Sequence, residues 1–251
     1  MLIQPLLDKL AELRLNAMRD GLEEQLQNPQ YAELPFEQRF GLLVDLEYAR
    51  RENNRMGRRL KAAHFHQKAL IEDLDLSATR GLPRAQVLEL AQSDWVRRHL
   101  NVIVVGPTGA GKTYLACALG NAACRADASV RYERTSRLLH ALDLARADGS
   151  YTKLLDGIAR TQLLIVDDWL RDPLSPPQTR DVLEILDDRY QRCSTLIATQ
   201  IPIRSWHERL SDPTLADALL DRLVHNAYRI EFTAQLDSQR KLRSALPRSD
   251  S

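Results

Sequence analysis

The chain has 251 residues, of which 44% are hydrophobic and 27% charged, and its formal net charge at pH 7 is +1. No run of about eighteen apolar residues occurs, which excludes a membrane-spanning helix, and the near-neutral charge means that any surface for nucleic acid must be local. The three cysteines lack metal-ligand spacing and the amino terminus lacks a secretory pattern, so we expect reduced thiols and a cytoplasmic location.

Residues 1–92 show helical periodicity and no strand pattern, which predicts a small all-helical N-terminal domain ahead of a second domain at 93–251. A long helix is predicted from Phe36 to Lys68. Charge is uneven within this region: the stretch from Asp8 to Glu47 carries a net charge of −5, and the stretch from Arg50 to Lys68 carries +6.

A basic helix of this density can bind DNA by neutralising backbone phosphates. On charge alone, a solvated helix face paired with the acidic segment upstream explains the pattern equally well. The candidate DNA-binding residues are Arg50, Arg51, Arg55, Arg58, Arg59 and Lys61.

From Trp95 onward the pattern alternates between strand and helix. Such alternation predicts an α/β fold in which a parallel sheet carries helices on both faces. The five expected strands fall near 102–105, 129–133, 162–166, 194–199 and 227–232.

A complete phosphate-binding loop follows the first expected strand and precedes a helical run. Its glycines allow backbone N–H groups to surround a polyphosphate, Lys112 can reach the outer phosphates, and the Thr113 hydroxyl can bind Mg²⁺. We therefore predict that the chain binds ATP. The candidate nucleotide-binding residues are Gly106, Pro107, Thr108, Gly109, Ala110, Gly111, Lys112, Thr113 and Tyr114.

A second apolar strand ends in Asp167 and Asp168, roughly fifty residues after the loop. Parallel strands bring such carboxylates to the edge where nucleotides bind. We expect Asp167 to hold the magnesium ion and Asp168 to orient or deprotonate the attacking water. A strand end with two solvated acids is the commoner explanation when no phosphate loop accompanies it.

Three further polar residues are candidates for contact with the phosphates. Gln200, or less favourably Thr199, ends the fourth strand and could touch the γ-phosphate or the attacking water, although a plain polar turn also fits. Arg222 lies in the helical run 217–224 before the last strand and could enter the nucleotide site of a neighbouring subunit, whereas pairing with Asp221 or Asp217 is the simpler role. Arg240 could sense phosphate.

The chain resembles the ATP-binding proteins of insertion sequences, the IstB family, in the DnaC-like branch of AAA+ ATPases. The resemblance covers nearly the whole length. It is carried by the phosphate loop and by Leu13-Arg14-Leu15, Arg58-Arg59-Leu60-Lys61, Arg80-Gly81-Leu82, Asp148-Gly149-Ser150-Tyr151, Asp167-Asp168-Trp169, Trp206-His207, Asp212-Pro213-Thr214-Leu215 and Asp221-Arg222-Leu223-Val224-His225-Asn226.

This resemblance implies a P-loop AAA+ core and a DNA-stimulated ATPase that assists a cognate transposase. It also implies self-association into a ring or filament on double-stranded DNA, with the N-terminal helices contributing to DNA binding. One departure is Leu170, which stands where the family usually has glycine, and a side chain there predicts a rearranged loop.

Other functions share the same phosphate loop. A helicase loader of the DnaC type would use the same ATPase for replication. A small-molecule phosphoryl transferase is less favoured, because no arginine-rich lid is apparent and two adjacent acids suit activation of water. A nucleotide-gated DNA-binding switch with negligible hydrolysis is the third alternative.

Overall fold

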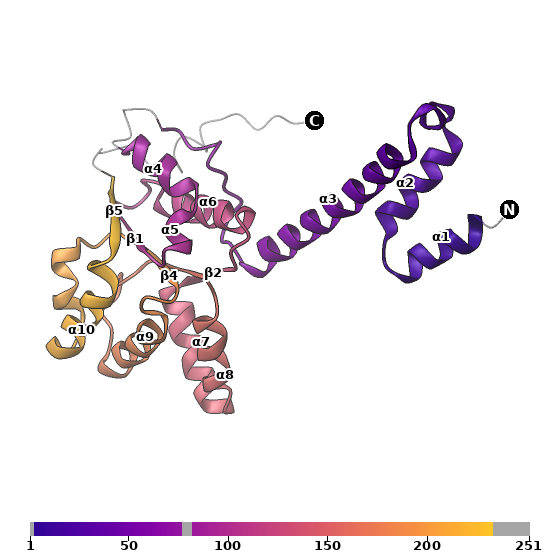
Figure 1. Cartoon of the computed structure of the whole chain (residues 1–251). Helices are drawn as coiled ribbons and strands as arrows, with labels where there is room; N and C mark the ends of the chain where they lie inside the picture. Colours follow the sequence, from indigo (N-terminus) through magenta and orange to yellow (C-terminus); the bar gives the residue numbers. More distant parts are fainter. Residues whose placement is uncertain (1–2, 77–81, 233–251) are drawn as a thin grey trace, which may run out of the picture. The chain divides into compact units, whose positions relative to one another are not determined.

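The computed structural model describes residues 3–76 and 82–232. The chain divides into two compact units, residues 1–58 and 59–251. The first unit is helical and the second contains a five-stranded sheet (Figure 1). None of the helices in the described ranges is long and apolar enough to cross a membrane.

The first unit contains α1 (Ile3–Glu12), α2 (Asn16–Gln27), a short 3₁₀ helix (Pro29–Glu33) and most of α3 (Phe36–Ala62). Helix α2 packs closely on α3 at Gly21, where a Cβ atom would lie 2.6 Å from Cδ1 of Leu46. A larger residue at this position would have to displace the end of the Leu46 side chain. Helix α3 ends at Ala62 rather than at the predicted Lys68, and the chain turns at His64, whose φ is 53°.

The boundary between the units lies at residue 58 rather than at the predicted residue 92. The segment after α3 belongs to the second unit because its apolar residues join the core beneath the sheet. Ala63, Ala69, Leu82, Val87 and Leu90 are all buried there. The backbone carbonyl of Ala63 also accepts a hydrogen bond of 2.9 Å from the N–H of Tyr132, on the edge strand β2. A helical pattern thus does not reveal to which core a segment belongs.

The sheet of the second unit is fully parallel, and its strand order is β2-β3-β4-β1-β5. Its strands are β1 (Asn101–Val105), β2 (Val130–Arg134), β3 (Leu163–Asp167), β4 (Ser194–Thr199) and β5 (Ala227–Glu231). The helices around it are α4 (Arg84–Ala91), α5 (Asp94–Arg97), α6 (Lys112–Arg125), α7 (Thr135–Asp148), α8 (Tyr151–Ala159), α9 (Pro176–Arg189) and α10 (Pro213–Val224), with 3₁₀ turns at Ile203–Ser205 and His207–Arg209. The predicted α/β architecture is confirmed.

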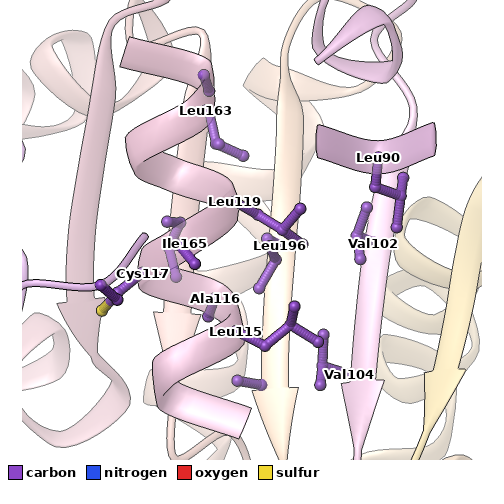
Figure 2. Packing of buried hydrophobic residues seen from close by; sticks show 14 of the residues in the cluster. Leu90, Val102, Val104, Leu115, Ala116, Cys117, Leu119, Leu163, Ile165 and Leu196 are labelled. Atoms are coloured by element: carbon purple, nitrogen blue, oxygen red, sulfur yellow. The ribbon is translucent and has the colours of Figure 1, made fainter. Parts of the chain in front are cut away.

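The three central strands, β1, β3 and β4, contribute to two hydrophobic cores because successive side chains point to opposite faces of the sheet. In β1, Val102 and Val104 join the core with α6, while Ile103 joins the core with α7, α9 and α10. Figure 2 shows Leu115 and Leu119 of α6 lying over the strands of the first face. Burial on both faces explains why β1 and β3 and most of β4 are continuous apolar runs in the sequence, whereas the edge strands β2 and β5 contain charged residues.

Candidate nucleotide-binding site

The phosphate loop connects the carboxyl end of β1 to the first turn of α6. Gly109 and Gly111 have φ angles of 83° and 105°, which favour glycine. Lys112 begins α6, and its ammonium group donates a 2.8 Å hydrogen bond to the carbonyl of Pro107, so it lies over the loop. Burial lowers the pKa of Lys112, although the charges of Asp167 and Asp168 act in the opposite direction. The loop therefore has the geometry expected of a polyphosphate cradle.

Asp167 ends β3 and is only 2% exposed. Its Oδ2 accepts hydrogen bonds of 2.7 Å from the hydroxyl groups of both Thr113 and Tyr132, and its Oδ1 accepts one of 2.9 Å from the N–H of Asp168. The structure thus brings together the two predicted magnesium ligands, Thr113 and Asp167. A hydroxyl group and a carboxylate are hard oxygen ligands, the type that Mg²⁺ prefers, so the residues present fit this ion.

Asp168 lies at the same edge of the sheet and its side chain is 41% exposed. Two guanidinium groups flank its Oδ2: Nε of Arg134 at 3.9 Å and Nη1 of Arg171 at 3.8 Å. Asp168 lines the cavity beside the phosphate loop, where a water molecule can reach its carboxylate. The two guanidinium groups attract this carboxylate and orient it.

The loop after the acid pair keeps a left-handed conformation at Leu170, where φ is 51°. Such a conformation costs about 1–2 kcal/mol for a residue with a side chain. It is held by burial of Leu170, which is 0% exposed, and by hydrogen bonds at the preceding residue. The N–H of Trp169 donates to the carbonyl of Ala198, and its carbonyl accepts a 2.6 Å hydrogen bond from the hydroxyl of Thr199. Leucine at this position thus adopts a positive φ despite its side chain.

Gln200 lies directly above the phosphate loop, since its Oε1 accepts a 2.6 Å hydrogen bond from the hydroxyl of Thr108. Thr199 is 0% exposed and uses its hydroxyl on Trp169. Of the two alternatives that the sequence left open, only Gln200 borders the nucleotide cavity.

This cavity has a volume of about 330 Å³. Its walls combine the phosphate loop with Tyr114, Leu82 and Phe232, which offer apolar surface, and with Asp168, Arg134 and Gln200, which offer polar groups. A concave site with apolar walls and a few convergent polar groups is typical of cofactor binding.

Sequence reasoning missed three residues around the acid pair: His66, Tyr132 and Arg134. Arg134 ends β2 and pairs in register with Asp167, while its Nη2 lies 2.8 Å from Nε2 of His66. The His66 ring stacks on Tyr132 at 6.3 Å between centroids, and burial, together with the nearby charge of Asp167, raises the pKa of Tyr132. The signal for Arg134 was available, because adjacent parallel strands place their carboxyl ends side by side.

Arg222 lies away from the nucleotide site of its own chain. Its carbonyl accepts a 3.0 Å hydrogen bond from Asn101, the first residue of β1, whereas the phosphate loop follows the last. Its guanidinium group pairs with Asp187 at 2.7 Å and with Asp221 at 3.2 Å. Any contact of Arg222 with a nucleotide must therefore involve a second copy of the chain. Arg240 lies outside the described residues.

The predicted DNA-binding residues differ in their partners. Arg51 pairs with Glu47 at 2.8 Å and Arg55 with Glu52 at 2.6 Å, both on α3 itself. Lys61 and Arg58 are exposed. Arg59 departs from the prediction, because its guanidinium group pairs with Asp127 and donates a 3.2 Å hydrogen bond to the carbonyl of Cys124 at the end of α6. The structure gives Arg59 a role in packing within the second unit.

The family of IstB-like ATP binding proteins matches residues 8–245. The chain belongs to this family. It is 44% identical to an insertion sequence ATP-binding protein of Sinorhizobium fredii, over 94% of this chain and 96% of the relative. It is 42% identical to the ATP-binding protein of insertion sequence IS1162 from Pseudomonas fluorescens, over 80% of this chain and 88% of the relative.

Solved structures share the fold of the sheet-containing unit. The DnaC helicase loader aligns with a TM-score of 0.55 and 20% identity, over 70% of this chain and 99% of that one. DnaA from Aquifex aeolicus, bound to AMPPCP, aligns with a TM-score of 0.58 and 17% identity, over 72% of this chain and 56% of that one. At this identity the likeness establishes the AAA+ fold alone.

Proposed function

We propose that this IstB-family protein is a magnesium-dependent ATPase that binds double-stranded DNA and assists the transposase of an insertion sequence. The observation that carries the proposal is the constellation at the sheet edge. The phosphate loop, Thr113 and the accessible Asp168 line one cavity, and the buried Asp167 accepts a hydrogen bond from Thr113. The relatives of the chain are insertion sequence ATP-binding proteins.

Each site residue has a distinct chemical role in this proposal. Backbone N–H groups of residues 106–113 and the ammonium group of Lys112 bind the outer phosphates, and Thr113 and Asp167 would hold a magnesium ion. That ion would supply positive charge against the β- and γ-phosphates. Asp168 accepts the proton of the water that attacks the γ-phosphorus while the bond to the β,γ-bridging oxygen breaks. Gln200 orients this water or the γ-phosphate.

Self-association forms the second part of the proposal. Arg222 cannot serve the site of its own chain, but a neighbouring copy in a ring or filament would bring it to the γ-phosphate as a transition-state ligand. Arg240 is the remaining candidate for phosphate sensing. Double-stranded DNA would bind along the exposed arginines of α3 and Lys61 and promote this assembly.

A helicase loader is the second candidate, since the DnaC loader shares the fold. The family match favours the transposition role because it begins at residue 8 and thus includes the N-terminal helices.

The decisive experiment measures steady-state ATP turnover with and without duplex DNA, with Lys112→Ala as the control. We expect magnesium-dependent turnover that duplex DNA increases and that Lys112→Ala abolishes. If the Lys112→Ala variant retained ATP turnover, the assignment of the ATP site to the phosphate loop would be wrong. If duplex DNA did not change the rate of hydrolysis, the proposed coupling of hydrolysis to DNA would be wrong. The two candidates are separated by their partners: the transposition role predicts that the protein stimulates a co-expressed transposase and does not load a helicase, and the loader role predicts the reverse.

A further inference from the structure

A basic groove lies within the first unit, apart from the nucleotide site. It has a volume of about 530 Å³ and is lined by five arginines, two asparagines and one glutamate, which amounts to a net charge of +4. The lining residues are Arg14, Asn16, Glu47, Arg50, Arg51, Asn54, Arg55 and Arg58. Two of them, Arg14 and Asn16, come from the corner between α1 and α2, so the groove has a second wall beyond α3.

The two walls are held together by Glu47, which is 7% exposed. One oxygen of Glu47 accepts hydrogen bonds from the N–H groups of Ala17 and Met18, at 2.9 and 3.4 Å, at the start of α2. The other accepts a 2.8 Å hydrogen bond from Nε of Arg51. Burial would raise the pKa of Glu47, but these hydrogen bonds outweigh it and the pKa lies below its ordinary value. Glu47 is thus a charged anchor between α2 and α3.

The arginines of the groove are not equally available. Arg51 and Arg55 are engaged with Glu47 and Glu52, and Arg50 lies 3.8 Å from Asp20. Within residues 3–76 and 82–232, no group forms a hydrogen bond or ion pair with the guanidinium of Arg14 or Arg58. Each of these two side chains therefore presents five N–H donors to an external ligand.

The side chains that line the groove favour a ligand with negatively charged oxygen atoms. Guanidinium and amide groups dominate it, and guanidinium forks match phosphate oxygens in pairs. From Arg51 to Arg58 the helix rises about 10 Å. Consecutive phosphates of one DNA strand advance about 3.4 Å along the duplex axis, so this length spans about three of them. A continuous phosphodiester backbone fits the groove better than a single small anion.

We propose that this groove seats the backbone of one DNA strand, with Arg14 as a phosphate ligand opposite Arg58. The inference rests on the proposed DNA-binding function and adds a residue and a mode of binding to it. Because the contacts are to phosphates, binding through the groove is independent of base sequence.

The test uses the full chain and two labelled duplexes of unrelated sequence, with affinity measured across a salt series. Arg14→Ala is compared with Arg58→Ala, with Arg55→Ala and with the control Arg19→Ala. Arg19 lies in the same unit but pairs with Asp20 at 2.6 Å and does not line the groove. Arg14→Lys keeps the charge and a side chain at this position, where φ is 58°.

We expect Arg14→Ala and Arg58→Ala each to weaken binding to both duplexes alike and to flatten the log–log salt slope by about 0.9. Arg55→Ala should have a smaller effect, Arg19→Ala none, and Arg14→Lys should retain the slope. Wild-type affinity and slope in Arg14→Ala, with losses in Arg58→Ala, would overturn the two-walled groove and leave DNA binding by α3 intact. Losses confined to one of the two sequences would also overturn it. If no variant changes binding, the proposed DNA-binding function of α3 itself fails.

Discussion

Replacement of Arg189 by methionine should destabilise the sheet-containing unit. Arg189 ends α9 and is only 1% exposed. Its Nη1 donates hydrogen bonds of 2.6 Å to the carbonyls of Ile158 and Thr161, and its Nη2 donates to the carbonyl of Ser194. Burial lowers its pKa to about 10, so it remains charged at neutral pH. One cation therefore satisfies the end of α8, the following turn and the start of β4.

The magnitude follows from these contacts. Arg189→Met removes this donor from two buried carbonyl groups and one that is partly buried, and the carbonyl of Ile158 keeps another donor, the N–H of Thr161. A buried polar group that loses its partner costs about 1–3 kcal/mol. Removal of a buried charge returns part of that free energy, because the guanidinium no longer has to be dehydrated. The cost of the unpaired carbonyl groups exceeds this gain, and we expect the free energy of unfolding to fall by about 3–5 kcal/mol. For a unit of this size, the melting temperature should fall by roughly 6–20 °C.

The assay is urea unfolding followed by circular dichroism, with Arg192→Met as the matched control. Arg192 is three residues away and exposed, so its replacement should leave stability almost unchanged. A loss below about 1 kcal/mol in Arg189→Met, or an equal loss in both variants, would show that the buried hydrogen bonds do not carry the stability assigned to them.

Three further outcomes test the catalytic site. Asp168→Asn should bind ATP normally but turn it over about 10²–10⁴ times more slowly, and a wild-type kcat would remove its role as a base. Tyr132→Phe removes a hydrogen bond to Asp167, so the magnesium concentration for half-maximal ATP binding should rise about 10-fold, and an unchanged titration would contradict this. Arg222→Ala and Lys112→Ala should each be inactive, whereas mixtures should recover part of the activity, and no recovery in co-assembled mixtures would argue against a shared site.

Much of the fold was predictable because its signals are local. Each strand lies within one residue of its predicted bounds at either end. For the central strands the reason is that a buried parallel strand is a short apolar run whatever its neighbours are, and the edge strands β2 and β5 follow from the alternation of strand and helix. The phosphate loop was equally clear, because its glycines and Lys112 act through their own backbone and through the helix that follows. Lys112, Thr113, Asp167 and Asp168 were therefore found as candidates without any knowledge of the strand order.

Residues that depend on contacts distant in sequence were not predictable. The strands, the phosphate loop and the residues that would bind phosphate and magnesium could be located from the chain alone, because neighbouring residues set these features. Packing between separate elements brought His66 to Arg134, paired Arg59 with Asp127, and joined Arg14 to the arginines of α3. It also moved the boundary between units to residue 58. These features arise where separate elements pack against one another. Such contacts join residues that are far apart in the sequence, so they leave no periodic pattern within any single segment.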